Sequence, residues 1–184
     1  ILHDGEESVA VELPLPGAYN VANAVGAAAL ALQLGASLDD CVVGLASMEA
    51  AFGRGERVRL RGRELLLMLV KNPVGANEVL RTLALEPRQL DVLAVLNDRI
   101  ADGRDVSWVW DADVEAAAPS VRRIVCSGTR AYEMAMRWRY AGVDPDRIEV
   151  VPELEAALDQ ALANTDTGGP LVVLPTYTAM LELR

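Results

Sequence analysis

Four predicted strands, each followed by small or polar residues and then by a helical pattern, constrain the fold more than any other feature. They are Glu64 to Val70, Leu90 to Leu96, Arg122 to Cys126 and Leu171 to Leu174. Within the second of them, the apolar run Asp91 to Leu96 is typical of a strand that is buried in a parallel sheet. Because strands alternate with helices, we predict an α/β fold that is Rossmann-like, with a mainly parallel sheet and helices on both faces.

A glycine-rich connector, Phe52-Gly-Arg-Gly-Glu56, precedes this pattern, and we place a domain boundary there, with one domain at residues 1–55 and the other at 56–184. In the first part we expect residues 1–13 to form a strand, from the weak alternation at Ser8 to Leu13, and a helix from Val21 to Leu34 that Asn20 can cap. The first part also has an expected helix, Leu38 to Ser47, capped by Ser37. In the second part, two further strands are expected, a hairpin strand Val58 to Arg61 and Arg147 to Val151. The helices expected there are Pro73 to Leu85, Ala112 to Ala118, Thr129 to Tyr140, Glu153 to Ala163 and a last helix after Pro175.

The segment Asn97 to Asp111, called here the strand-end loop, follows the apolar run Asp91 to Leu96. It holds four aspartates, two arginines and two of the three tryptophans. In open α/β sheets, ligands and chemistry collect beyond the carboxyl ends of strands. A solvated acidic loop whose tryptophans pack on the sheet edge is the simpler interpretation. Two large aromatics in a short polar loop instead favour a fixed loop shape or a partner that covers them.

Other strand ends also carry small or polar residues, and in a doubly wound sheet all of them emerge on one edge, which we call the strand-end rim. The segments are Lys71-Asn72, Asn97-Asp98, Ser127-Gly-Thr129 and Thr176-Tyr-Thr178. Taken singly each has a structural alternative: Ser127-Gly-Thr129 can be a helix cap, and Lys71 can form a salt bridge.

Composition excludes several classes of function. The formal net charge of −10 is unfavourable for nucleic-acid binding, because phosphate contacts need lysine and arginine. The only histidine is His3, so a self-contained Ser/His or Cys/His catalytic unit is not expected. Cys41 and Cys126 have no metal-type spacing, and we expect buried free thiols in a reducing, cytoplasmic setting and no zinc site. No apolar run approaches the length of a membrane span.

The sequence has no Walker loop and no Gly-x-Gly-x-x-Gly motif. The phosphate loop for any nucleotide would therefore lie outside this chain.

Several motifs resemble the Mur ligases, which couple ATP hydrolysis to amide-bond formation in peptidoglycan precursors. They are the segment from Leu15 to Leu30, the connector Phe52 to Glu56, and Lys71-Asn-Pro73, where those ligases usually have His-Asn-Pro. The strand-end loop and the closing segment Leu174 to Leu181 are similar, within that group, to the MurT subunits of lipid II isoglutaminyl synthases. The resemblance implies a C-terminal domain preceded by the tail of the ATPase domain, and a chain that is inactive by itself.

The resemblance also implies a reaction and partners. ATP with Mg²⁺ would activate the α-carboxyl of the D-glutamate in lipid II, and ammonia from a GatD-like glutaminase subunit would convert it to D-isoglutamine. An aspartate of this chain would complete the Cys/His site of the glutaminase, since a carboxylate orients a histidine tautomer. Asp111 is the first candidate and Asp105 the second. The structural alternative for Asp111 is the N-cap of a helix that starts at Ala112.

By the same resemblance, six further residues would contact ATP or the substrate: Asn20, Asn23, Arg54, Lys71, Asn72 and Asn97. The asparagines of the first domain have alternative roles as helix cap and helix surface, and Arg54 as a hinge salt bridge. Lys71 stands in place of the usual histidine, which separates this chain from most of the ligases.

Two other functions stay open: the C-terminal domain of a Mur-type amino-acid ligase that receives its amino acid at the strand-end loop, and a non-catalytic module that docks a glutaminase.

Overall fold

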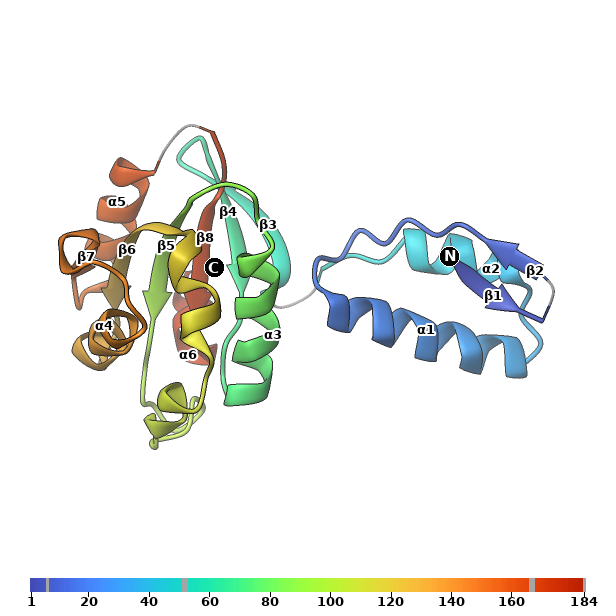
Figure 1. The fold of residues 1–184 in the computed structure, drawn as a ribbon, viewed down its shortest axis with the longest axis horizontal. Helices are drawn as coiled ribbons and strands as arrows, with labels where there is room; N and C mark the ends of the chain where they lie inside the picture. The colour runs from blue at the N-terminus through green and yellow to red at the C-terminus, as the bar shows by residue number, and fades with distance from the viewer. Residues whose placement is uncertain (6, 51–52, 166–167, 184) are drawn as a thin grey trace. The chain divides into compact units, whose positions relative to one another are not determined.

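A computed structural model describes residues 1–5, 7–50, 53–165 and 168–183, and its contacts divide the chain into two compact units. Unit 1 is Ile1–Ala51 and unit 2 is Phe52–Arg184 (Figure 1). Phe52, at the start of the predicted connector, lies outside the described residues. No helix in the described ranges is long and apolar enough to cross a membrane.

Unit 1 consists of a short hairpin and two helices. Strands β1 (Leu2–Asp4) and β2 (Glu7–Val9) pair antiparallel, and the strand that the sequence predicts to run on to Leu13 is wrong. Pairing stops at Val9, because the described part of the chain offers residues 10–13 no partner strand. Helices α1 (Ala18–Gln33) and α2 (Leu38–Ala46) pack through a small core that is made of Ala24, Ala28, Cys41 and Leu45.

The two helix starts in unit 1 differ in how they match the sequence. Helix α1 begins after Gly17, whose φ of 97° ends the preceding turn, so the predicted capping role of Asn20 is wrong. Asn20 is already helical and buried, and its amide donates a hydrogen bond of 2.7 Å to the carbonyl of Pro16. The predicted Ser37 cap is confirmed: Ser37 and Asp40 exchange side-chain and backbone hydrogen bonds in a capping box.

Unit 2 is built on a six-stranded sheet with the order β3-β4-β8-β5-β6-β7 (Figure 1). Strand β3 is antiparallel to β4, and every other neighbouring pair is parallel. The predicted hairpin is confirmed, with a two-residue turn in which Arg61 and Gly62 have φ of 51° and 78°. The strands are β3 (Arg54–Leu60), β4 (Arg63–Met68), β5 (Leu90–Val95), β6 (Val121–Ser127), β7 (Ile148–Val150) and β8 (Leu171–Pro175).

Alternate side chains of the strands enter two separate cores, which confirms the prediction of helices on both faces. Val92 and Ala94 of β5 face α3 (Pro73–Ala84) and α4 (Ala131–Tyr140). Leu93 and Val95 face α5 (Leu154–Asn164) and α6 (Tyr177–Glu182). The period of two along each strand therefore determines which helix covers which face.

The helix predicted from Ala112 to Ala118 is wrong, because this stretch forms short 3₁₀ turns. They are η2 (Val114–Ala116) and the start of η3 (Ala118–Ser120); η1 (Ser107–Trp110) precedes them, and η4 (Pro145–Arg147) precedes β7. Pro119 has no N–H to continue an α-helical ladder. The carbonyl of Ala112 also accepts a hydrogen bond from the side chain of Arg137, which ties this part of the backbone to α4.

Gly128, at the carboxyl end of β6, is a position where only glycine fits. Its φ is 93°, and a Cβ atom there would lie 2.5 Å from the carbonyl oxygen of Leu96 and 2.6 Å from Oδ1 of Asn97. Both atoms belong to the end of the neighbouring strand, so neither can move without disturbing the sheet. The close approach of these two strand ends therefore depends on the missing side chain.

We expect Gly128→Ala to lower the free energy of unfolding by about 3 kcal/mol, from about 1–2 kcal/mol of left-handed strain and a further cost of overpacking. Gly142→Ala is the matched control, because its φ is 99° but no atom lies within 4 Å of the added Cβ. Urea unfolding of both variants measures the difference. Equal destabilisation by the two substitutions would contradict the role of close approach.

Candidate functional site

Asn97 joins the ends of three strands and so builds the strand-end rim. Its backbone N–H donates to Oγ1 of Thr176 at 3.1 Å, and its side-chain Nδ2 donates to Oγ1 of Thr178 at 3.0 Å. Its Oδ1 accepts from the backbone N–H of Thr129 at 3.0 Å. The predicted meeting of polar strand ends is confirmed for three of the four segments, Asn97-Asp98, Ser127-Gly-Thr129 and Thr176-Tyr-Thr178. Asn97 itself is buried, and both ends of its amide are used within the fold.

Two of the four aspartates of the strand-end loop hold the rim together. Asp98 accepts a hydrogen bond of 2.8 Å from the hydroxyl of Thr129 and lies 3.8 Å from the Arg130 guanidinium. Asp102 is buried and accepts from the N–H and the hydroxyl of Thr178, at 2.7 and 2.6 Å. Because the Asp102 carboxylate lies against the first turn of α6, its negative charge also suits the helix dipole. These bonds fix the start of the loop to α6 and to the β6–α4 connection.

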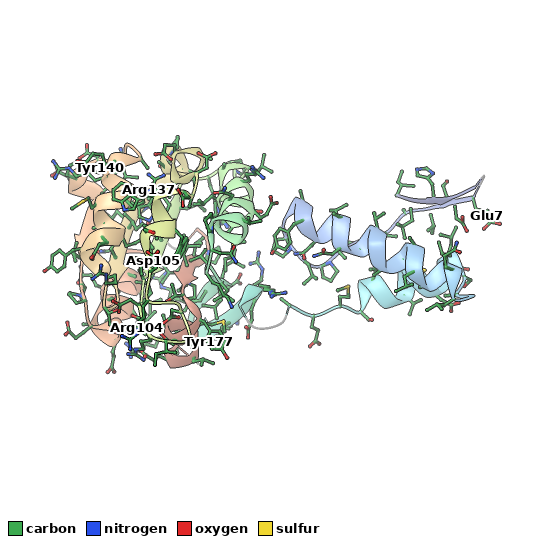
Figure 2. All side chains as sticks on the ribbon, turned by 90° about the horizontal axis from the view of Figure 1, so that it is seen from below. Glu7, Arg104, Asp105, Arg137, Tyr140 and Tyr177 are labelled. Carbon is green, nitrogen blue, oxygen red and sulfur yellow. The ribbon has the colours of Figure 1, made fainter. Side chains whose placement is uncertain are left out.

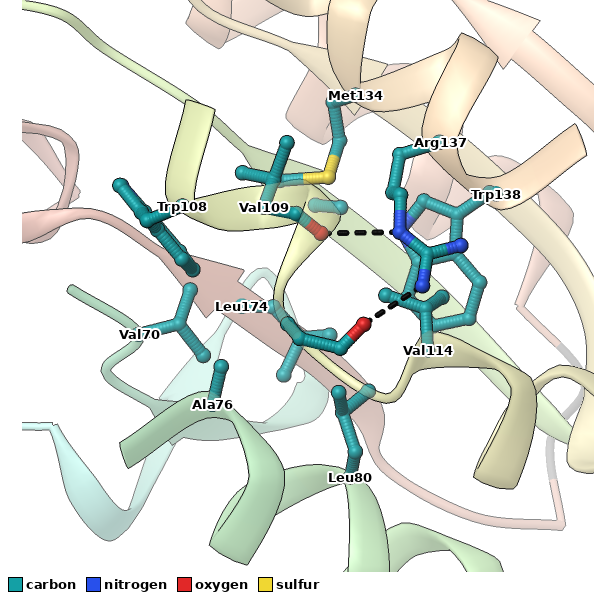
Figure 3. Close-up of a pocket in the computed structure, with 12 residues that line it drawn as sticks. Val70, Ala76, Leu80, Trp108, Val109, Val114, Met134, Arg137, Trp138 and Leu174 are labelled. Carbon is teal, nitrogen blue, oxygen red and sulfur yellow. Dashed lines mark hydrogen bonds between the residues drawn. The ribbon is translucent and has the colours of Figure 1, made fainter. Parts of the chain in front are cut away.

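Arg137 of α4 fixes the other end of the loop. Its Nε donates to the carbonyl of Val109 at 2.9 Å and its Nη2 to the carbonyl of Ala112 at 2.6 Å (Figure 3). The guanidinium also forms a bidentate pair with Glu115, at 2.8 and 2.6 Å, and this bond lowers the pKa of the Glu115 carboxyl. The Arg137 side chain is buried, so its charge is matched by carbonyls and a carboxylate rather than by water.

The two tryptophans of the loop face opposite ways. Trp108 packs on the core beside Val70 and Leu174, at a cavity of about 30 Å³ under the loop (Figure 3). Trp110 is half-exposed, makes an edge-to-face contact with Tyr140 at 5.7 Å, and lies 5.7 Å from the Arg137 guanidinium. The sequence left two interpretations of these tryptophans: packing on the sheet edge, or a role in loop shape or partner binding. Packing holds for Trp108, whereas the exposed surface of Trp110 is available to a partner.

Asp105 and Asp111 occupy the exposed part of the loop. One oxygen of Asp105 accepts from the backbone N–H of Ser107 at 2.9 Å, and the Ser107 bonds lower the pKa of the Asp105 carboxyl. Asp111 is exposed, and within residues 1–5, 7–50, 53–165 and 168–183 its carboxylate has no hydrogen bond or ion pair. The N-cap alternative for Asp111 is wrong, because the next turn starts at Val114. Figure 2 labels Asp105 and Arg104 on the loop and Arg137 and Tyr140 on α4.

A surface pocket of about 540 Å³ opens beside the loop, between the loop and the start of α6. Arg99 on its wall is paired with Glu182 of α6. Arg104 is exposed, and no partner for its guanidinium occurs in the part of the chain that the structure describes. The lining residues are Asp98, Arg99, Ile100, Ala101, Arg104 and Thr178.

The other candidate residues lie on both units. In unit 2, Lys71 is exposed without an ion pair to any described residue, so the salt-bridge alternative does not apply within these ranges. Asn72 caps α3, accepting from the N–H of Gly75 at 2.8 Å, and Arg54 is exposed at the start of β3. In unit 1, Asn23 is exposed on α1 three residues after the buried Asn20.

Both cysteines are buried free thiols, as expected, and burial raises the pKa of the Cys126 thiol. A search of the described residues for three or more His, Cys, Asp or Glu side chains that could hold a metal ion finds no such group.

Sequence reasoning did not single out Arg137, and it flagged Asp102 and Thr178 only as members of the loop and of the rim, without their pairing. For Arg137 a signal existed: it stands between Met134 and Trp138, which are four residues apart and lie on the buried face of α4. A charged residue on an apolar helix face needs a buried partner. For the bond between Asp102 and Thr178 no local signal existed, because the two residues lie 76 positions apart.

Sequence comparison gives a family and two close relatives. Residues 69–180 match the family model "MurT ligase C-terminal". The chain is 37% identical over 182 residues to the lipid II isoglutaminyl synthase (glutamine-hydrolyzing) subunit MurT of Streptococcus pneumoniae, covering 98% of this chain and 40% of that protein. It is 32% identical over 175 residues to the MurT subunit of Staphylococcus aureus, covering 94% and 39%. The chain thus spans about 40% of the length of these relatives.

Solved structures share the fold. A crystal structure of MurF from Acinetobacter baumannii superposes with a TM-score of 0.70 at 25% identity, over 98% of this chain and 40% of that chain. The similarity covers the α/β sheet and its helices, and it supports the fold class that the sequence predicts.

We expect Arg137→Met to lower the free energy of unfolding by about 2–4 kcal/mol, because the carbonyls of Val109 and Ala112 lose their buried donor. Arg139→Met on the same helix is the control, since Arg139 is exposed and unpaired among the described residues. Chemical denaturation measures both. A cost for Arg137→Met no larger than that for Arg139→Met would show that the loop does not depend on this anchor.

The Glu115–Arg137 pair also predicts a pH dependence. The folded-state pKa of Glu115 is lowered from its ordinary 4.5, so its contribution to stability is present above about 4.5 and is lost as the pH falls through the folded-state value. The stability difference between the parent chain and Glu115→Gln should therefore shrink on acidification below that range. Urea unfolding at a series of pH values tests this. A difference that stays constant from neutral to strongly acid pH would rule the linkage out.

Proposed function

The chain belongs to the MurT ligase C-terminal family, and from that premise we propose that it is part of the ligase-like subunit of a lipid II isoglutaminyl synthase. In this proposal residues 56–184 are the C-terminal domain, and residues 1–55 are the tail of the ATP-binding central domain. The match over residues 69–180 and the identity to two MurT subunits support the assignment. Buried free thiols fit a reducing compartment, and we place the reaction in the cytoplasm.

The proposed reaction amidates the α-carboxyl of the D-glutamate in lipid II. The carboxylate attacks the γ-phosphorus of ATP and ADP leaves, which gives an acyl phosphate. Ammonia, released from glutamine by a GatD-like glutaminase subunit, then attacks the acyl carbon, and phosphate leaves with the bonding electrons. The product is the primary amide, D-isoglutamine, and the displaced proton goes to solvent or to a base.

The observation that carries the proposal is the pair of exposed carboxylates on an anchored loop, Asp105 and Asp111. A glutaminase that uses cysteine and histidine needs a carboxylate to hold the histidine tautomer and to stabilise the imidazolium. The Arg137 anchor limits the movement of the loop backbone, and a catalytic carboxylate must keep its geometry within a fraction of an ångström.

The two aspartates offer this carboxylate in different ways. Asp111 is unpaired among the described residues and follows Trp110 directly, so a surface that covers Trp110 reaches it. Asp105 has one oxygen oriented by the Ser107 N–H, and its other oxygen can accept from histidine. This pre-orientation makes Asp105 a stronger candidate than the sequence alone suggested, and we retain both.

For ATP, the group of unit 2 that we favour is Lys71. Lys71 is an exposed cation without an ion pair in the described ranges, next to the N-terminus of α3, and it fits a phosphate. The amides of Asn72 and Asn97 already make hydrogen bonds within the fold, which leaves Lys71 as the better ligand of the three. Asn20, Asn23 and Arg54 remain proposed contacts of the nucleotide. In this proposal Mg²⁺, like the phosphate loop, is held mainly by the part of the enzyme that lies outside this chain.

The test is glutamine hydrolysis by the purified GatD-like glutaminase, mixed with this chain or its variants. If Asp111 completes the site, Asp111→Asn should lower the hydrolysis rate by roughly 10³-fold or more, by analogy with other triad carboxylates, and Asp105→Asn should change it little. If Asp105 does so, the two results are exchanged. Affinity for the glutaminase should remain within a few-fold in both variants.

Asp113→Asn is the control, because Asp113 is exposed close by and its side chain makes no bond to the described residues. Normal hydrolysis in Asp105→Asn, in Asp111→Asn and in the double variant would refute the shared catalytic site. In that case, retained binding would leave only a docking module that recruits the glutaminase.

A further inference from the structure

One face of α4 carries a row of large exposed side chains that the proposed chemistry does not use. Tyr132, Met136 and Tyr140 are 69%, 50% and 73% exposed and follow one another at intervals of four residues. Residues at this spacing are neighbours on a helix surface. Single exposed apolar residues are normal in proteins, but a continuous row of them marks an interaction surface.

The row continues from α4 onto the strand-end loop. The ring of Tyr140 meets the ring of Trp110 edge to face at 5.7 Å, and Trp110 is 47% exposed. Arg137 lies 5.7 Å from the Trp110 ring and binds the carbonyl of the preceding residue, Val109, so Trp110 is held in place before any partner binds. We call Tyr132, Met136, Tyr140 and Trp110 the α4 surface.

The composition of the α4 surface matches the centres of protein interfaces. Tyrosine, tryptophan, methionine and arginine are enriched there, and aromatic side chains supply contact area with few rotatable bonds. Arg139, between Met136 and Tyr140, is exposed and has no ion pair in the described ranges. A partner that covers this face is therefore expected to bring an apolar centre with a carboxylate near its rim.

The position of the α4 surface identifies its occupant. Asp111 follows Trp110, and a triad carboxylate must come within hydrogen-bond distance, about 3 Å, of the histidine that it orients. A protein that receives the Asp111 carboxylate must therefore cover the surface around Trp110, which continues along Tyr140 to Met136 and Tyr132. We propose that the α4 surface is the docking site of the glutaminase subunit, an inference that rests on the proposed function with Asp111 as the shared carboxylate.

The test is to place a charge on this surface at positions that make no contact with the loop. Met136→Glu and Tyr132→Glu keep helix propensity, and each should raise the Kd for the purified GatD-like glutaminase at least tenfold, because a carboxylate would be buried in an apolar contact. Val74→Glu is the matched control, since Val74 is 75% exposed on another helix, α3. Calorimetric titration measures Kd, and thermal unfolding monitored by circular dichroism shows that the variants fold.

The readouts separate docking from catalysis. At saturating concentration, Met136→Glu and Tyr132→Glu should support the normal rate of glutamine hydrolysis, whereas the decisive aspartate variant should bind normally and lose that rate. An unchanged Kd in both α4 variants, or an effect no larger than that of Val74→Glu, overturns the docking site while the proposed function stands. Altered self-association of the chain with unchanged glutaminase affinity would assign the surface to a second copy and also overturn it. Failure of the unchanged chain to bind the glutaminase would refute the proposed function and the docking site together.

Discussion

The buried guanidinium of Arg137 is the interaction on which the outer part of the strand-end loop depends. It donates to two backbone carbonyls and to both oxygens of Glu115, so one side chain organises the loop from Val109 to Glu115. A planar group with several fixed donors can do this, whereas a lysine at the same place offers a single point of attachment. The cost of burying the charge is offset only because all these partners are present together.

Anchoring at both ends gives the loop an inner and an outer side with different tasks. On the inner side, Asp98 and Asp102 bind the β6–α4 connection and α6, and Trp108 fills the core. On the outer side, Asp105 and Asp111 keep their carboxylates exposed on a backbone that is already fixed. A rigid inner side is what allows exposed side chains to present a defined geometry to another protein.

This division fits a site that is shared between two proteins. The sequence contains one histidine, His3, so unit 2 can supply a carboxylate but no imidazole. In the function that we propose, the missing base and nucleophile come from the glutaminase, and the α4 surface next to Trp110 supplies the binding energy. The α4 surface would then control the affinity for the glutaminase, and the loop aspartates would control the rate of glutamine hydrolysis. Substitutions in each set can measure the two effects separately.

Local periodicity in the sequence predicts the strands of unit 2, most of the helices and a mainly parallel sheet, and the rule that parallel strands share an edge predicts that polar strand ends converge. The sequence also singled out the strand-end loop. Only the tertiary structure decided which of the loop's residues are structural. The bonds of Asn97 to α6 and its connection span 79 and 81 residues, and those of Arg137 to the loop span 28 and 25. The bond from Arg137 to the Ala112 carbonyl, where the predicted helix is replaced by 3₁₀ turns, is likewise long-range, so no local pattern in the sequence encodes it.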